Sequence, residues 1–162
     1  MRSLERAIGR SGGFTLIELV ITISIIAILA AVALPRYISL QTQARAAKMQ
    51  AIYGGVRSAS ALAHAQAIAT NALPAAPVAM EGTNVTQVNS YPTADAAGII
   101  TALQLDATND QVTISAGGAL AGSTITIDIN GATTAANCRV SYTAAAVNGS
   151  PIIALPLVPD CS

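Results

Sequence analysis

One uninterrupted apolar run, from Phe14 to Leu34, limits what this chain can fold into more than any other feature. Its 21 residues include a single charged side chain, that of Glu18. A helix rises about 1.5 Å per residue, so a run of this length spans roughly 30 Å, the thickness of a bilayer's hydrocarbon core. Composition agrees, since 10% of all residues are charged, against roughly 25% in a soluble domain. The run therefore predicts a transmembrane helix.

Basic residues before the run predict its orientation in the membrane. Arg2, Arg6 and Arg10 precede it, and positive charge tends to stay on the cytoplasmic side. Arg36, directly after the run, weakens this asymmetry. We expect the remainder of the chain to face outward.

Charge is also divided between the middle of the chain and its C-terminal part. The basic residues of the middle are Arg36, Arg45, Lys48 and Arg57. Beyond Ser58, six acidic residues and one arginine leave a net charge of minus five (one minus six). These two regions are expected to attract each other between subunits, the alternative being ordinary solvated charge.

Two features distinguish the run from an ordinary secretory signal peptide. Such a peptide is cut after its apolar region at a small-residue site, and residues 27–35 (AILAAVALP) offer one. However, a charged Glu18 is expensive inside that region, and Gly12-Gly13 supplies a small, flexible cleavage site in front of it. Cleavage after Gly13 would leave the apolar helix on the mature protein.

The helix is predicted to continue well beyond the membrane. Pro35 predicts a kink or local melting, because proline donates no hydrogen bond and clashes with the preceding turn. Residues 36–70 are rich in strong helix formers. An apolar stripe at spacings of three and four predicts packing against a domain, and it consists of Met49, Ile52, Val56, Ala59 and Ala63. Gly54-Gly55 within this stretch indicates either close packing against the backbone or a tolerated weak spot.

Residues 71–162 are predicted to form a head domain with an antiparallel sheet. Prolines and glycines make residues 71–92 irregular apart from a possible short strand at 85–88, and residues 94–105 are ambiguous for a second helix. Alternating or β-branched runs then predict four strands, at residues 111–115, 123–129, 138–143 and 152–158. Asn130-Gly131 and Asn148-Gly149 are typical of hairpin turns. The predicted fold class is α+β, a long N-terminal helix packed on a small antiparallel sheet.

Cys138 and Cys161 are the two cysteines of the chain. Neither lies in a metal-binding pattern, so a disulfide between them is the expected arrangement, with two buried free thiols as the alternative. Disulfides persist in oxidising compartments, which places the head outside the cytoplasm.

Residues Gly13 to Val20, with the sequence GFTLIELV, resemble the processing and assembly signature of type IV pilins and the related type II secretion pseudopilins. The signature joins a basic leader, a glycine, a phenylalanine, a glutamate four residues later and a long apolar helix. Pro35 matches a position where many members carry proline. Residues 33–45 (ALPRYISLQTQAR) are similar to the corresponding stretch of mannose-sensitive haemagglutinin pilins, a more local match of the type IVa kind.

The resemblance implies how the chain is processed. A membrane prepilin peptidase would cleave between Gly13 and Phe14, and the new N-terminus on Phe14 would be methylated. The implied segments are a leader at residues 1–13, a membrane and assembly half at 14–35, an amphipathic half at 36–70 and the head at 71–162.

The resemblance also implies how the chain assembles. Glu18 is expected to pair with the amine of Phe14, on its own chain or on a neighbouring copy, because an unpaired carboxylate costs about 2.5 to 3.5 kcal/mol on membrane insertion scales. Ala27, Ala30, Ala31 and Ala33 would permit close helix approach. The implied partners are further copies of the chain, the prepilin peptidase, the inner-membrane assembly machinery and membrane lipid.

The implied function is structural. The subunit would move from the inner membrane into an extracellular type IV pilus for adhesion, motility or uptake; the alternative is the major pseudopilin of a type II secretion system. We expect no enzymatic activity, cofactor, metal or direct nucleic-acid binding. His64 is expected to be structural, and the residues Asp106, Asn109 and Asp110 are interpreted as an Asx-rich turn, with a calcium site as the alternative.

Overall fold

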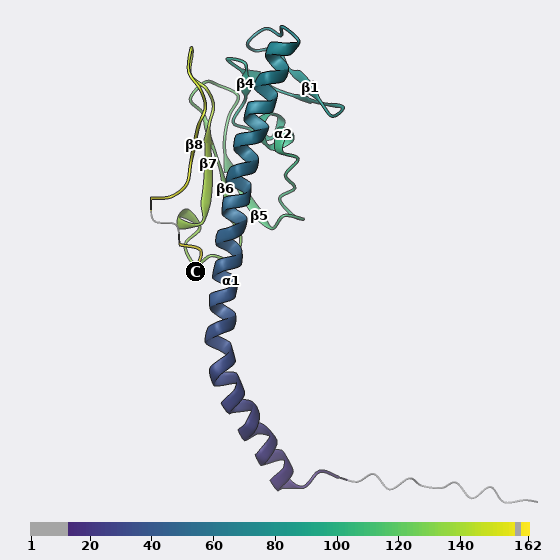
Figure 1. Ribbon diagram of the computed structural model, residues 1–162, viewed down its shortest axis with the longest axis vertical. Coiled ribbons are helices and arrows are strands. Elements are labelled where there is room, and N and C mark those ends of the chain that lie inside the picture. The colour runs from purple at the N-terminus through teal and green to yellow at the C-terminus, as the bar shows by residue number, and fades with distance from the viewer. Residues whose placement is uncertain (1–12, 158–159) are drawn as a thin grey trace, which may run out of the picture. The chain divides into compact units, whose positions relative to one another are not determined.

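The computed structural model describes residues 13–157 and 160–162. They form two compact units, one up to Ile38 and one from Ser39 onward, which are described separately. The first unit consists of the start of helix α1, whose full extent is Leu16–Ala69 (Figure 1). Pro35 lies inside α1, so the helix resumes after the proline as predicted.

The second unit contains the rest of α1 and the head. Its main sheet has four antiparallel strands in sequence order: β5 Val112–Ala116, β6 Thr124–Ile129, β7 Arg139–Thr143 and β8 Ile152–Ala154. Two small hairpins precede it, pairing β1 Val78–Met80 with β2 Thr83–Val85 and β3 Gln87–Val88 with β4 Tyr91–Pro92. The short helical elements are η1 Ala96–Ile100, α2 Thr101–Leu103 and η2 Ala135–Asn137. The α+β prediction is thereby confirmed.

One detail of the predicted sheet is wrong. The last strand ends at Ala154 instead of reaching Val158, which lies outside the described residues; Pro156 follows shortly after it and has no N–H for a strand ladder. Asn130-Gly131 and Asn148-Gly149 lie in the β6–β7 and β7–β8 connections, each of which joins two neighbouring antiparallel strands. Gly131 and Asn148 adopt positive φ angles there, 88° and 59°, as turn residues do.

The predicted stripe of α1 supplies one side of the head's core. Met49, Val56, Ala59 and Ala63 are buried, and Ile52 is partly buried against the same core. The facing residues come mainly from the inward positions of the sheet and from η1, and include Ile99, Ile125, Ile127, Val140 and Tyr142. Figure 1 shows β7 and β8 to one side of α1, with the β1–β2 hairpin and α2 to the other.

The glycine pair in α1 has a different explanation at each position. A Cβ placed on Gly55 would lie 2.8 Å from Cδ1 of Leu103, whereas a Cβ on Gly54 would meet nothing within 4 Å. Close packing is therefore present at Gly55, where a larger residue would force the side chain of Leu103 to move. Space does not require glycine at position 54.

Two ring side chains of the head, Tyr142 and His64, bind backbone carbonyls. The hydroxyl of Tyr142, which is fully buried, donates a 2.7 Å hydrogen bond to the carbonyl oxygen of Pro92. His64 stacks on Tyr91, with 4.0 Å between ring centroids, and its Nδ1 lies 2.8 Å from the carbonyl oxygen of Ser90. Since a carbonyl only accepts, Nδ1 carries the proton. His64 is structural in this arrangement.

Tyr142 predicts a loss of stability at alkaline pH. Burial raises the pKa of Tyr142 to about 12, above its unfolded value of about 10. The protonated Tyr142 therefore contributes about 2–3 kcal/mol to the free energy of unfolding. This contribution is fully present below pH 10 and is lost as the pH rises toward 12. We expect Tyr142→Phe to remove that slope while costing about 1 kcal/mol at neutral pH through the lost hydrogen bond.

Urea unfolding in detergent at pH 8, 10 and 12 would measure this difference. Tyr37→Phe is the matched control, because it removes the same hydroxyl from an exposed side chain. Equal pH dependence in the native protein and in Tyr142→Phe would contradict the prediction.

Candidate functional site

The first half of α1 presents apolar side chains that nothing in the described structure covers. Every large hydrophobic residue from Phe14 to Leu34 is exposed, from 46% at Val20 to 89% at Phe14. The helix is long and apolar enough to cross a membrane. Burying such side chains is worth about 1.5–3 kcal/mol each, so this surface requires lipid or protein around it.

The polar residues of this segment satisfy their hydrogen bonds within the helix. The hydroxyl of Thr22 donates to the carbonyl of Leu19 at 2.8 Å, and that of Ser24 donates to the carbonyl of Val20 at 2.7 Å. Both groups can therefore enter an apolar environment without an unpaired donor.

Thr15 and Glu18 form a reciprocal cap at the start of α1. A carboxylate oxygen of Glu18 accepts hydrogen bonds from the backbone N–H of Thr15 at 2.9 Å and from its hydroxyl at 2.8 Å. The backbone N–H of Glu18 donates to the hydroxyl oxygen of Thr15 at 3.2 Å. This is a capping box, which satisfies donors that the first turn of a helix leaves without partners.

Thr15 caps the start of α1, a role that was not predicted from the sequence. The pattern Thr-x-x-Glu directly before an apolar run is a recognised helix-start signal, and it lies inside the segment already singled out. Glu18 thus has a partner within its own chain. Its pairing with an amine on Phe14 stays a prediction, because Phe14 is an internal residue of this chain.

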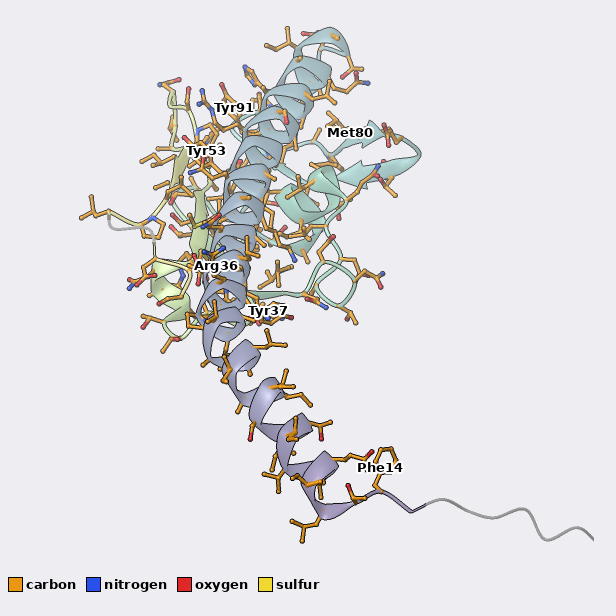
Figure 2. All side chains as sticks on the ribbon, turned by 60° about the horizontal axis from the view of Figure 1, so that its bottom comes forward. Phe14, Arg36, Tyr37, Tyr53, Met80 and Tyr91 are labelled. Carbon is orange, nitrogen blue, oxygen red and sulfur yellow. A yellow bond between two sulfur atoms is a disulfide. The ribbon has the colours of Figure 1, made fainter. Side chains whose placement is uncertain are left out.

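The predicted cleavage site lies just before the cap. Gly13 precedes α1 in irregular backbone, is exposed, and has open space around its Cα. Phe14 projects from the start of the helix (Figure 2). Gly12, Arg2, Arg6 and Arg10 lie outside the described residues.

Small side chains on the same helix leave a shallow groove. Ala30, Ala33, Leu34 and Tyr37 line a hollow of about 340 Å³. Two of the four alanines predicted to permit close helix approach therefore lie along a recess. α1 runs through Pro35 without interruption, so the local melting expected there does not occur in this structure, and the alternative of a kink stays a prediction.

The two cysteines form the predicted disulfide, and a cation of α1 binds beside it. Cys138 and Cys161 are bonded and buried. Nε of Arg45 donates a 2.6 Å hydrogen bond to the carbonyl oxygen of Cys161. One turn further along, Nζ of Lys48 donates to the carbonyl oxygen of Asp110. Two residues of the predicted basic middle thus bind the head of their own chain.

A further ion pair lies on the sheet. Arg139 on β7 donates two hydrogen bonds to the carboxylate of Asp128 on β6, at 2.6 and 2.8 Å. These bonds raise the pKa of Arg139, so its guanidinium stays charged at neutral pH. The pair contributes to strand alignment in the head.

The acidic loop before β5 is an Asx turn. The carboxylate of Asp106 accepts from the backbone N–H groups of Thr108 and Asn109, and that of Asp110 accepts from the N–H of Asp106. Among residues 13–157 and 160–162, no group of three or more His, Cys, Asp or Glu side chains is arranged to hold a metal ion. The interpretation as a turn is confirmed by these contacts.

Comparison with known proteins supports the signature. Residues 8–34 match the family model of the prokaryotic N-terminal methylation motif. The chain is similar to the type IV narrow pilus major component PilA5 of Thermus thermophilus, with 53% identity over 58 residues, which cover 36% of this chain and 50% of that relative. The chain thus spans about half the length of the curated relative it matches. No solved structure matches the chain.

These two matches support the prediction of a type IV pilin, and they do not favour the pseudopilin alternative over it. The motif and the apolar helix also fit a precursor anchored in a membrane. A pilin is a structural protein, which agrees with the expectation that the chain is not an enzyme.

Proposed function

We propose that this chain is a structural subunit of a type IV pilus, held in the membrane as a precursor and polymerised into an extracellular fibre. The observation that carries the proposal is the fully exposed apolar half of α1, which starts at a capping box directly after Gly13 and matches the methylation motif. If this half of α1 were buried within its own chain, it would need neither lipid nor other copies of the chain to cover it.

Processing is proposed to occur at Gly13. A prepilin peptidase would cut the peptide bond between Gly13 and Phe14, where the backbone is irregular and accessible. Residues 1–13 are then the leader, and the N-terminal amine of Phe14 is methylated. The product retains five basic and seven acidic side chains, because Arg2, Glu5, Arg6 and Arg10 leave with the leader.

Glu18 is proposed to act in two successive hydrogen-bonding states. In the precursor its carboxylate is held by the N–H and hydroxyl of Thr15. Cleavage creates a cation on Phe14, one residue before Thr15. A charge-assisted pair with that amine, on the same or a neighbouring copy, is stronger than a neutral hydrogen bond. The carboxylate would then set the register of an incoming subunit.

Assembly exchanges one apolar environment for another. In the membrane the surface of residues 14–35 contacts lipid, and in the fibre it contacts the same surface of other copies. Transfer between two apolar phases changes the free energy little compared with exposure to water. Extraction by an inner-membrane machine could therefore proceed in either direction, with small residues such as Ala30 and Ala33 permitting close contact.

The head, residues 71–162, is proposed to face the cell exterior and to cover the fibre. Its disulfide suits an oxidising compartment. Adhesion, motility and uptake are all compatible with this location, and the chain needs no cofactor for any of them.

Electron microscopy of sheared surface filaments, combined with mass spectrometry, tests the proposed function. We expect filaments that disappear when the gene is deleted, and an N-methylated peptide that begins at Phe14. Filaments seen only on overexpression would favour the pseudopilin alternative. A mature N-terminus beyond Leu34 would show that the apolar run is a removable secretory signal and would contradict the proposal.

Variants of the capping box separate charge from helix capping. Glu18→Val should still insert and be cleaved, yet lower filament yield at least about tenfold, because the amine loses its partner. Glu18→Gln keeps an acceptor for Thr15 but removes the charge, so we expect a similar loss. Thr15→Val keeps the charge and weakens only the cap, and it should assemble normally.

Filament yield after shearing and the cleaved fraction on immunoblots would be measured for all three variants. Normal piliation of Glu18→Gln and Glu18→Val would remove the electrostatic account of this residue.

A further inference from the structure

Most charged side chains of the head are already bound within their own chain. Residues 39–162 contain four basic side chains, and three of them have partners: Arg45 binds the carbonyl of Cys161, Lys48 binds that of Asp110, and Arg139 binds Asp128. Arg57 is exposed and makes no hydrogen bond or ion pair with the described residues. Its guanidinium carbon lies 5.9 Å from the ring centroid of Tyr53.

The acidic side chains show a similar division. Each of the five aspartates of this unit, Asp95, Asp106, Asp110, Asp128 and Asp160, accepts a hydrogen bond from the backbone or from Arg139. Glu81 differs, because its carboxylate accepts only from the side chain of Gln104, at 2.5 Å. Among the described residues from Ser39 onward, Glu81 and Arg57 are thus the charges that no backbone group or ion pair holds.

Glu81 occupies a backbone position that disfavours it. It lies at the tip of the β1–β2 hairpin with φ of 48°, followed by Gly82 with φ of 84°. Two successive positive φ angles are typical of a type I′ turn, where Asn-Gly is preferred and a β-carbon of a longer side chain is strained. The turn itself therefore gives no reason for a glutamate, and strained positions of this kind often serve a function.

An apolar groove lies beside Glu81, and we call it the Leu62 groove. It consists of three adjoining hollows of about 570, 220 and 160 Å³ that share Leu62, with Gly55, Met80, Glu81 and Leu103 among the other lining residues. Leu62 is 60% exposed. The groove combines an apolar floor with one carboxylate at its rim.

Arg57 and the Leu62 groove lie on opposite sides of α1. Tyr53 and Leu62 are nine residues apart, which at 100° per residue places them about 180° apart around the helix. Figure 2 shows Tyr53 on one side of α1 and Met80 on the other. A single copy cannot bring the Tyr53–Arg57 side into its own groove.

We propose that the Leu62 groove of one copy receives the Tyr53–Arg57 side of a second copy, with Arg57 paired to Glu81. This inference rests on the proposed function as a polymer subunit. The two surfaces are complementary, since an exposed cation beside a half-buried aromatic ring meets an apolar hollow with an anion. They are also different surfaces of the same chain, so the contact is heterologous and can repeat from copy to copy into a filament.

This contact would be one way in which the basic middle of one copy attracts the acidic head of another. Arg45 and Lys48 bind carbonyls of their own head, so Arg57 is the basic residue from Ser39 onward that remains for a contact between copies. Nothing in the contact requires residues 14–35, which means that it orients the heads independently of the membrane helix.

A charge exchange in the full-length protein tests this pairing. We expect Glu81→Arg and Arg57→Glu each to lower filament yield at least about fivefold, because like charges then face each other across the contact. The double variant Glu81→Arg with Arg57→Glu should restore yield to within about twofold of the native chain. Arg36→Glu combined with Glu81→Arg is the control, because Arg36 is an exposed cation outside the contact, and it should not restore yield.

Each outcome decides one question. Native-level filaments from both single variants, or rescue by Arg36→Glu in place of Arg57→Glu, would overturn the pairing while leaving the proposed function intact. If the native chain forms no filaments at all, the proposed function fails and the pairing with it. Unfolding temperature and cleavage at Gly13 would be measured for each variant, so that loss of folding or processing is recognised.

Glu81→Asn gives a second readout that a merely structural glutamate would not produce. Asparagine tolerates positive φ, so we expect an unfolding temperature about 2–4 °C higher in detergent. Filament yield should nevertheless fall about threefold, because the charge is lost. An increase in both quantities, or a decrease in both, would contradict the proposal.

Discussion

Everything else in this structure depends on one constraint: the apolar surface from Phe14 to Leu34 has no partner within the described chain. A soluble protein would bury such a surface against a sheet or a second helix. Here the side chains point outward around the whole helix, so the environment must come from lipid or from other molecules. The hydroxyls of Thr22 and Ser24 donate to carbonyls of their own helix, and the capping box at Thr15 satisfies donors of its first turn. These polar groups can therefore enter an apolar environment without losing their hydrogen bonds.

The second half of the same helix follows different physical rules. Its apolar residues are confined to one stripe, where Met49, Val56 and Ala63 meet the sheet, and its polar residues bind specific carbonyls of the head. One continuous element thus changes from a surface that is apolar all round to an amphipathic one. The division of the chain into two compact units after Ile38 reflects this change.

Local patterns predicted most of this organisation because their causes are local. Strand alternation identified β5 to β7, helical spacing identified the buried stripe, and cysteine count identified the disulfide. The extent of strands and connections was predicted less accurately. The connection after β6 contains η2, and β8 ends before Pro156, which has no N–H for a strand ladder.

The candidate site was predicted to a similar degree. Gly13, Phe14 and Glu18 follow from a compact motif, whereas the bonds of Arg45 and Lys48 join residues far apart in sequence and leave no local signal. Thr15 is a different case. Its Thr-x-x-Glu pattern is present in the sequence, but Glu18 was interpreted only through the free-energy cost of placing a carboxylate in a membrane.

The bond from Arg45 to Cys161 has a consequence for biogenesis. Its two residues are 116 positions apart, and the disulfide next to it joins Cys138 to the same distant segment. Contacts between such distant residues form late and slowly. In a pilin precursor of the proposed kind, the apolar helix would enter the membrane while the head is still an open chain, and the head would close only after Cys161 had reached an oxidising compartment. Anchoring would then precede folding, so a head that is still incomplete would already be confined to the membrane surface.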